Sequence, residues 1–268
     1  DTEAIRPEDI ELAAAWSKQH GLDSIVSTDG DGDRPLISDE NGEWLRGDIA
    51  GILCAQYLQA TAIVTPVSSN SAVELSGLFQ HVLRTRIGSP YVITGMEESM
   101  RDGHQCVIGY EANGGLLQAD SLRLNGHTLA ALPTRDAVIV IMAILVMSHK
   151  LDKPISALLA SLPQRFTYSD RLKQFPAEIS HSRLASITEA DAKAAQEQII
   201  ELFGEQFGQV SNIDATDGVR ISFSGGDVVH LRPSGNAPEL RCYTEADSAV
   251  RAREINATCM QILEGWRS

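Results

Sequence analysis

The amino-acid sequence predicts an α/β fold: a layered domain on a mixed, mostly parallel sheet, followed by a C-terminal α+β domain. Strand-like and helix-like segments alternate up to about residue 165, which is typical of parallel, layered sheets. From about residue 166 onward, strands joined by a tight Ser-Gly-Gly-Asp turn indicate antiparallel pairs. The 268 residues, 43% of them hydrophobic, suffice for two domains or for one domain with an appendage.

Hydrophobic periodicity and end signals define the elements of the first part. Pro7 in a first turn and Gly21 at the end bound a helix. "LDSIVST" is predicted to be a short buried strand that leads into an aspartate loop, the place where open α/β sheets bind ligands. The segments that follow are a helix at Gly47–Leu58, the strand "TAIVTPV", a helix "SSNSAVELSGLFQHVL" capped by Ser69 or Asn70, the strand "QCVIGY" and an apolar helix around 136–149.

The second part has signals of its own. A short strand lies between Pro163 and Pro176, and Thr188 with Asp191 predicts a capping box at the start of a helix. "GVRISF" and "VVHLRP" are predicted to form a hairpin, "ELRCYTEA" a further strand, and the segment from about Ser248 to Trp266 a final helix. We therefore expect a separate α+β domain from about residue 166.

Composition excludes several kinds of protein. The formal net charge of −14 argues against a nucleic-acid partner, because such binding needs many Lys and Arg contacts. Four widely separated cysteines form no CxxC pair, which favours reduced thiols in a cytoplasm. The longest apolar run, Ala137–Met147, is too short to span a membrane. Because the chain opens without an initiator Met or a signal peptide, we expect it to be a piece of a longer protein.

The segment "STDGDGDR" places Asp29, Asp31 and Asp33 at alternate positions. Alternate residues of a turning segment can direct three carboxylates at one point, and hard divalent cations prefer such ligands. An EF-hand calcium loop is disfavoured, because Arg34 stands where that loop needs glycine, although Glu40 falls at its twelfth position. A divalent-cation site and an acidic surface turn remain as the alternatives.

The segment "HLRPSGNAPELRCY" gathers hydrogen-bond donors suited to an anion. The donors come from Arg232, Ser234, Gly235, Asn236 and Arg241. Glycine exposes backbone amides, Ser and Asn add side-chain donors, and Arg supplies a planar fork for phosphate. In so acidic a chain this cluster indicates a local phosphate site, with ordinary turn chemistry as the alternative.

Two further polar segments give weaker signals. In "GYEANGG", Glu111 and Asn113 suit the recognition of vicinal hydroxyl groups, and a polar turn is the alternative. In "RTRIGSPYV", the cations Arg84 and Arg86, with Ser89 nearby, are candidates to line a cleft for an anionic substrate. They would equally suit a surface near a helix C-terminus, where cations are favoured.

Taken in this order, the segments resemble the motifs of the α-D-phosphohexomutase superfamily, most closely its bacterial phosphomannomutase branch. "DGDGDR" is similar to the metal-binding loop, "GYEANGG" to the sugar-binding loop and "RPSGNAPELR" to the phosphate-binding loop. "TPVSSNS" and "RTRIGSPYV" are also similar to that branch. The resemblance covers nearly the whole chain.

Members of this family have four domains around a central cleft. The resemblance implies that residues 1–46 are the C-terminal part of the second domain, 47–165 the third domain and 166–268 the fourth. The family's first domain, with its phosphoserine loop, has no counterpart in this sequence. We therefore expect the chain to need the missing N-terminal domains of the same protein, and to be inactive alone.

The family mechanism assigns roles by resemblance. An enzyme phosphoserine gives its phosphoryl group to a hexose phosphate, and the hexose 1,6-bisphosphate turns around before it returns the other phosphoryl group. The resemblance implies that Asp29, Asp31 and Asp33 bind Mg²⁺ and that Arg34 contacts the reacting phosphoryl group. It implies that Glu111 and Asn113 bind sugar hydroxyls and that Arg86 and Ser89 lie near the substrate. The residues implied to bind the non-reacting phosphate are Arg232, Ser234, Gly235, Asn236 and Arg241. At Arg86 and Ser89 relatives often carry Lys and His, so the proton-transfer groups are left unassigned.

The activity implied is the Mg²⁺-dependent interconversion of mannose 1-phosphate and mannose 6-phosphate, catalysed by an isomerase. Phosphoglucomutase and phosphoglucosamine mutase are alternatives on the same scaffold, because the sequence does not identify the substituent at the sugar's 2-position. A non-catalytic sugar-phosphate-binding module is the alternative from another class. We expect a hexose phosphate as the ligand, with no nucleic-acid or membrane partner.

Overall fold

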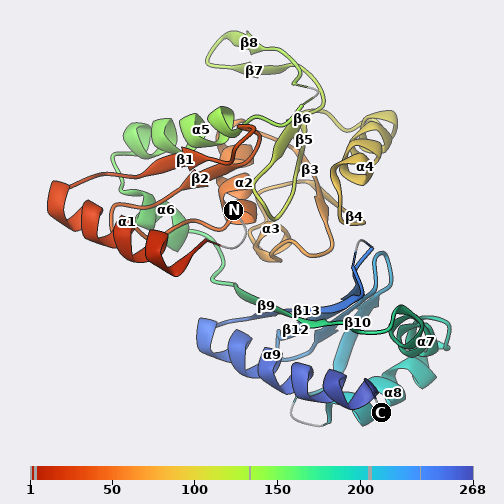
Figure 1. Ribbon diagram of the computed structural model, residues 1–268. Coiled ribbons are helices and arrows are strands. Elements are labelled where there is room, and N and C mark those ends of the chain that lie inside the picture. The colour runs from red at the N-terminus through yellow and green to blue at the C-terminus, as the bar shows by residue number, and fades with distance from the viewer. Residues whose placement is uncertain (1, 3–4, 133, 205–206, 236, 268) are drawn as a thin grey trace. The chain divides into compact units, whose positions relative to one another are not determined.

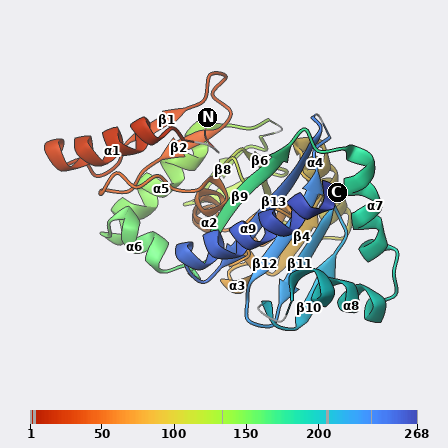
Figure 2. The same cartoon turned by 60° about the horizontal axis from the view of Figure 1, so that its bottom comes forward.

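The computed structural model describes residues 2, 5–132, 134–204, 207–235 and 237–267 (Figure 1; Figure 2). The chain divides into two compact units, Asp1–Pro163 and Gln164–Ser268, and each unit buries a hydrophobic core of its own. Within the described ranges, none of the helices is long and apolar enough to cross a bilayer.

The first unit is built on a four-stranded sheet with the order β4-β3-β5-β6. Strand β3 (Ala62–Pro66) pairs in parallel with β4 (His81–Thr85) and with β5 (Val107–Tyr110), while β6 (Leu116–Gln118) is antiparallel to β5. The predicted α/β class, with a mixed and mostly parallel sheet, is confirmed.

Helices pack on both faces of this sheet (Figure 1). Side chains of neighbouring residues in a strand point to opposite faces, so β3 contributes to two cores. Ile63 lies in the core that contains residues of α2 (Gly47–Tyr57) and α5 (Ala137–Leu151), whereas Val64 lies in the core that contains Met96 of α4 (Ser89–Arg101). The predicted helices at 47–58 and 136–149 are therefore confirmed; a short helix, α6 (Ile155–Ala160), follows them.

The aspartates lie in the loop of a small hairpin. Strands β1 (Val26–Thr28) and β2 (Pro35–Ile37) pair antiparallel, and helix α1 (Pro7–His20) precedes them and ends at Gly21 as predicted (Figure 1). The expectation of a buried strand at the edge of an open parallel sheet is wrong. All three residues of β1 are exposed, because β1 and β2 form a two-stranded sheet of their own.

The long helix predicted from "SSNSAVELSGLFQHVL" is also wrong. Helix α3 covers Ala72–Leu75, and the residues from His81 belong to strand β4. Gly77 follows the helix with φ of 63°, a left-handed conformation that glycine adopts easily and that ends the helix. The N-cap of α3 is Ser71 rather than the predicted Ser69 or Asn70, although Asn70 Oδ1 accepts a hydrogen bond from the amide of Ala72 at 2.8 Å.

A second hairpin was not anticipated from the sequence. Strands β7 (Leu122–Leu124) and β8 (His127–Leu129) pair antiparallel and extend away from the four-stranded sheet (Figure 1). Asn125 and Gly126 connect them with φ values of 51° and 82°, as a tight type I′ turn requires. The Asn-Gly pair in the sequence was the available signal.

The second unit contains a five-stranded antiparallel sheet with the order β10-β11-β12-β13-β9. Its strands are β9 (Phe166–Lys173), β10 (Val210–Asp214), β11 (Val219–Phe223), β12 (Val228–Pro233) and β13 (Glu239–Ala246). The β11–β12 hairpin, strand β13 and the last helix, α9 (Ala249–Glu264), agree with the prediction, and a 3₁₀ turn, η2 (Gly265–Arg267), follows. The C-terminal α+β fold is therefore confirmed.

The helix boundaries near residue 190 differ from the prediction. Thr188 is the last residue of α7 (Ala177–Thr188), a helix that the sequence reading missed. Asp191 alone caps α8 (Ala192–Phe203), because its Oδ1 accepts hydrogen bonds from the amides of Lys193 and Ala194 at 3.0 and 2.9 Å. The predicted capping box of Thr188 and Asp191 is therefore wrong.

Candidate functional site

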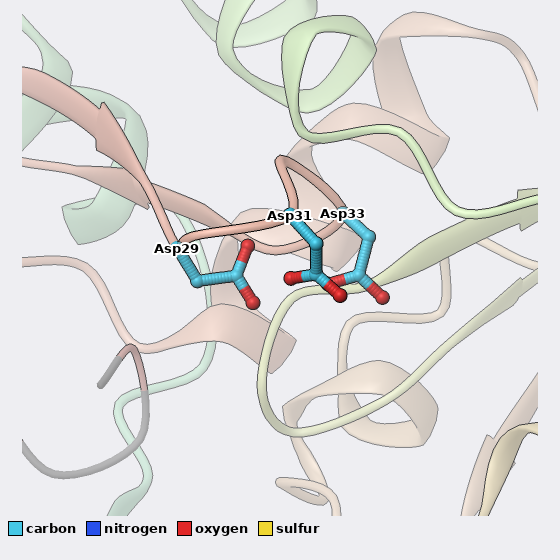
Figure 3. Close-up of side chains that lie close together, drawn as sticks. All are labelled: Asp29, Asp31 and Asp33. Carbon is cyan, nitrogen blue, oxygen red and sulfur yellow. The ribbon is translucent and has the colours of Figure 1, made fainter.

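The three loop aspartates come together in space. Asp29, Asp31 and Asp33 each offer a carboxylate oxygen within 4.8 Å of the others, the one such group of acidic, His or Cys side chains in the described part of the chain (Figure 3). The loop turns at Gly32, whose φ is 76° and whose amide donates to the Asp29 carbonyl at 3.2 Å. In Figure 3 the carboxylate of Asp29 points toward those of Asp31 and Asp33.

Arg34 holds Asp29 through both its main chain and its side chain. The Arg34 amide donates to Asp29 Oδ1 at 3.1 Å, and Arg34 Nε donates to Asp29 Oδ2. Burial by itself would raise the pKa of Asp29, but the hydrogen bonds from Arg34 outweigh it and lower this pKa to about 2. Asp29 is therefore an anion at neutral pH, as a cation ligand must be.

Asp33 lies in a different environment. Burial raises the pKa of its carboxyl group, against the opposing influence of Arg135. Asp33 Oδ2 pairs with Arg135, while Asp33 Oδ1 is buried without a hydrogen-bond partner among the described residues; Arg34 Nε lies 3.5 Å from it. A buried carboxylate oxygen without a donor, beside two further carboxylates, fits a hard cation such as Mg²⁺.

Glu40 does not belong to this cluster. Its carboxylate accepts hydrogen bonds from the amide of Ser156, at 3.2 Å, and from the Ser156 hydroxyl at the start of α6. The group of carboxylates within reach of one another is limited to Asp29, Asp31 and Asp33 in the described residues. Because its twelfth-position ligand is used to cap a helix, the loop lacks the arrangement of an EF-hand.

The Gly-rich loop after β5 holds Glu111 in a buried position, with 7% of its surface exposed. The Ser89 hydroxyl, in the first turn of α4, donates to Glu111 Oε2 at 2.7 Å. Asn113 Oδ1 accepts a hydrogen bond from the amide of Gly115 at 2.9 Å, which uses that oxygen to shape the loop. The structure thus brings Ser89 and Glu111 together, as two neighbours from different elements.

Arg135 joins this loop to the aspartates, and the sequence reading did not identify it. One guanidinium nitrogen, Nη1, donates to Glu111 Oε2 at 2.9 Å, and the other, Nη2, pairs with Asp33 Oδ2. Arg135 lies just before Asp136, the residue that caps α5. The available signal was a lone Arg-Asp pair before an apolar helix, which does not by itself indicate a site.

The two arginines of "RTRIGSPYV" have different surroundings. Arg84 pairs with Glu74 and donates to the carbonyls of Pro66 and Ser69, so it holds the loop after β3 in place. Arg86 is exposed, and its guanidinium carbon lies 5.9 Å from the centre of the Tyr91 ring. The alternative that both lie near a helix C-terminus is wrong, because they lie at the end of β4 and before α4.

In the second unit, the predicted phosphate loop connects β12 to β13. Arg232 and Arg241 face each other as partners across these strands, and acidic side chains balance them: Asp217 lies 2.8 Å from Arg232 Nε, and Glu239 lies 3.6 Å from Arg241 Nη2. The amide of Ser234 donates to the Glu239 carbonyl at 2.8 Å. The loop also contains Gly235, and the predicted residue Asn236 lies outside the described residues.

Comparisons with known proteins agree with the motifs. Residues 46–166 match the family model described as phosphoglucomutase/phosphomannomutase, alpha/beta/alpha domain III, and residues 182–262 match that of the C-terminal domain of the same family. A phosphomannomutase of Salmonella muenchen is 46% identical over 97% of this chain and 53% of its own length. A phosphomannomutase of Sinorhizobium fredii is 43% identical over 98% of this chain and 54% of its own length. The chain therefore spans about half the length of the curated relatives it matches.

Solved structures with the same fold come from this family as well. A phosphoglucomutase/phosphomannomutase family protein of Burkholderia thailandensis matches 99% of this chain and 52% of its own, with a TM-score of 0.71 at 16% identity. An Aspergillus fumigatus N-acetylphosphoglucosamine mutase, solved with GlcNAc-6P and magnesium, matches 92% of this chain and 49% of its own, with a TM-score of 0.62 at 16% identity. The chain belongs to the phosphoglucomutase/phosphomannomutase family, as its sequence motifs predicted.

Proposed function

We propose that these residues are the metal-, sugar- and phosphate-binding part of a phosphomannomutase, an isomerase that interconverts mannose 1-phosphate and mannose 6-phosphate. The observation that carries this proposal is the identity of 43–46% to two curated phosphomannomutases over nearly the whole chain. The cluster of three carboxylates, one of which has a buried oxygen without a hydrogen bond among the described residues, supports the use of Mg²⁺ in that reaction.

The identities also favour mannose over its alternatives. Relatives named as phosphoglucosamine mutases, from Sorangium cellulosum and Geobacillus thermodenitrificans, are only 26% and 27% identical to this chain. One named as a phosphoglucomutase/phosphomannomutase, from Thermococcus kodakarensis, is 29% identical. A purely non-catalytic binding module is disfavoured, because the two relatives that are 43–46% identical over nearly the whole chain are named as phosphomannomutases.

We assign the metal to Asp29, Asp31 and Asp33, where the bound ion would neutralise charge on the transferring phosphoryl group. Arg34, the proposed catalytic residue, would place its positive charge on the reacting phosphoryl group. Glu111 accepts hydrogen bonds from sugar hydroxyls, and the NH₂ group of Asn113 donates one, because its oxygen is bonded within the loop.

Further contacts are assigned to the substrate and its phosphate. Ser89 orients Glu111, and Arg86 is exposed just after β4, where its positive charge would attract an anionic substrate. The non-reacting phosphate is bound by Arg232, Ser234, Gly235, Asn236 and Arg241. Arg232 and Arg241 lie opposite each other on neighbouring strands, so two positive side chains stand close to the loop that joins these strands, which supports an anion site there.

Turnover is proposed to need a phosphoserine that this sequence does not contain. None of its serines stands in the context of the family's phosphoserine loop, so we expect the 268-residue chain alone to be inactive. Its partner would be the N-terminal part of the same protein, which the curated relatives include in chains about twice as long. No step of the reaction requires a membrane or a nucleic acid.

The test is an assay of the longer protein that contains these residues. With Mg²⁺ it should convert mannose 1-phosphate to mannose 6-phosphate faster than the corresponding glucose and glucosamine phosphates, and removal of the metal by a chelator should stop the reaction. Asp31→Ala should lower kcat by about a thousandfold or more, because the reacting charge loses its cation. Asp23→Ala removes the same charge from an exposed site and serves as the control.

Three results would overturn the assignment: turnover that survives the chelator, equal effects of Asp31→Ala and Asp23→Ala, or a clear preference for another hexose phosphate. The 268-residue chain should show no turnover even with a hexose 1,6-bisphosphate supplied. Activity of this chain alone would contradict the proposed need for an external phosphoserine.

A further inference from the structure

Arg135 is the residue that connects the aspartate loop to the Glu111 loop. Its two terminal nitrogens each bind a different carboxylate, Nη1 that of Glu111 at 2.9 Å and Nη2 that of Asp33. The side chains involved are 28%, 9% and 17% exposed for Arg135, Glu111 and Asp33, so these pairs are largely shielded from water. Ion pairs in such surroundings are screened less by salt than pairs at an open surface.

The position of Arg135 is fixed by its neighbours. A side chain at Gly115 would place its Cβ 2.6 Å from Arg135 Cδ, so the absence of one there leaves room for the arginine. On the other side, the amide of Ala137, at the start of α5, donates to the carbonyl of Gly32 in the aspartate loop at 3.2 Å. Arg135 is thus held between the two loops by the packing around it.

The contacts of Arg135 decide which carboxylate oxygens are left for a ligand. Arg135 binds Oδ2 of Asp33, while the buried Oδ1 has no hydrogen bond among the described residues and lies 3.5 Å from Arg34 Nε, with which it forms an ion pair. At Glu111, Arg135 and Ser89 both bind Oε2. The guanidinium group of Arg135 therefore already binds the carboxylate of Asp33, which a divalent cation would also bind.

We propose that Arg135 is a resident cation that competes with the divalent metal for Asp33 and couples the metal loop to Glu111. A metal ion drawn to Asp33 weakens the pair of Arg135 with that carboxylate, and the guanidinium then interacts more strongly with Glu111. Because coupling between two binding equilibria is reciprocal, a ligand on Glu111 changes the affinity for the metal by the same factor. The sugar half of this inference rests on the proposed function, whereas the metal half does not.

The first experiment uses the 268-residue chain and Mn²⁺ alone, with binding followed by calorimetry or by the EPR signal of the free ion. Arg135→Met removes the charge at similar length and should tighten Mn²⁺ binding about threefold or more, because repulsion of the cation is lost. Arg135→Lys keeps the charge and should stay within about twofold of the wild type. Arg123→Met, at an exposed position on β7, is the control for net charge.

A purely structural role of Arg135 predicts a different result for Mn²⁺ binding. If Arg135 served only to hold the loops, Arg135→Met would weaken Mn²⁺ binding or leave it unchanged, and that outcome would overturn the proposal. Equal tightening in Arg135→Met and Arg135→Lys, or in Arg123→Met, would overturn it as well, because the local charge would then not be the cause. Circular dichroism of each variant checks that the fold is retained.

The second experiment measures coupling with mannose 6-phosphate as the probe. In the wild-type chain, saturating Mg²⁺ should change the Kd of mannose 6-phosphate by a factor of about three or more, and in Arg135→Met that factor should approach one. The same factor in both proteins would refute the coupling. If mannose 6-phosphate binds to no variant, the proposed sugar function fails, while the Mn²⁺ titration still decides the role of Arg135.

Discussion

Two arginines, Arg34 and Arg135, form ion pairs with the carboxylates of the aspartate loop. Arg34 binds Asp29 and lowers its pKa to about 2, while Arg135 binds one oxygen of Asp33 and Arg34 Nε lies 3.5 Å from the other. Three carboxylates held this close repel one another, and the two guanidinium groups offset part of that repulsion in the absence of a metal. The loop can therefore keep its carboxylates converged before a cation binds.

His230, on strand β12, carries a prediction about pH. It is 2% exposed, and its Nε2 lies 2.6 Å from the carbonyl of Asp217. Burial lowers its pKa from 6.5 to about 4, so the ring stays neutral in the folded protein where it would be protonated in the unfolded chain. Its contribution to stability is therefore fully present above about pH 6.5 and is lost as the pH falls toward 4.

We expect the free energy of unfolding of the second unit to fall by about 2 kcal/mol through His230 between pH 7 and pH 5. Urea unfolding followed by Trp266 fluorescence measures it, in a background where Trp16→Phe and Trp44→Phe remove the other tryptophans. His230→Gln keeps a donor for the Asp217 carbonyl and cannot titrate. The free energy of unfolding of this variant should therefore fall by about 2 kcal/mol less between pH 7 and pH 5 than that of the wild type. Equal losses in both proteins would exclude His230 as the cause.

Individual site residues differed in how far the sequence could predict them. The convergence of Asp29, Asp31 and Asp33 followed from their alternation in a turn, and the structure brings them within 4.8 Å. Arg135 was missed because its partners are distant in the sequence: Asp33 and Glu111 reach it only once the hairpin loop and the loop after β5 are folded against α5. The roles assigned to the site residues stay predictions.

At the scale of elements, the beginning of α2 positions the loop that contains Glu111. Gly47, the first residue of α2, lies so close to this loop that a Cβ there would approach the backbone nitrogen of Gly114 to 2.3 Å. Gly114 itself has φ of 86°, so the loop is already in a conformation that few other residues adopt. The helix and the loop therefore fit together only with glycine at position 47.

Gly47→Ala should destabilise the first unit by about 1–3 kcal/mol, the usual cost of forcing an extra carbon into a packed site. It should also weaken mannose 6-phosphate binding, because the loop that carries Glu111 must shift. Gly30→Ala is the matched control, since a Cβ at Gly30 meets no atom within 4 Å and no positive φ is involved. Urea unfolding and calorimetry measure both effects, and identical values for the two variants would disprove the close-packing argument.

Elements with a strong local signal were predicted, and those that depend on tertiary pairing were not. Helix α5 is apolar from Ala137 to Met147 and strand β3 is fully buried, so their patterns are clear in the sequence. The sequence predicts a helix where strand β4 lies, because "LFQHVL" fits either the helical or the strand period; pairing with β3 makes this segment a strand. Helix α7 was missed because a buried serine, Ser180, interrupts its apolar stripe.

At the scale of the whole molecule, the change of pattern near residue 165 corresponds to a real change of architecture. A mixed sheet with helices on both faces lies before Pro163, and an antiparallel sheet lies after Gln164. The two architectures could be predicted because parallel sheets need alternating helices, whereas hairpins need only tight turns. The strand orders could not, since pairing between distant strands has no local signature.

The second unit, Gln164–Ser268, should therefore fold as a separate protein. It has a five-stranded sheet and a core of its own, in which Phe203 packs against Phe207 and Phe223 with ring centres 5.4 and 6.3 Å apart. A chain of about 100 residues is above the size at which domains need disulfides or metals to fold. Expressed alone, it should unfold cooperatively in urea, with a Trp266 midpoint within about 0.5 M of that in the whole chain.

Phe203→Ala in this fragment should lower its stability by about 3–5 kcal/mol, because a fully buried ring is removed from the centre of the core. In the 268-residue chain, the same substitution should lower the free energy of unfolding measured by Trp266 fluorescence by an equal amount. Trp44 fluorescence, in the Trp16→Phe and Trp266→Phe background, should keep its midpoint, because Trp44 lies in the first unit. A fragment without a cooperative transition, or a Trp44 midpoint that moves with the Trp266 midpoint, would mean that the second unit depends on the first for its stability.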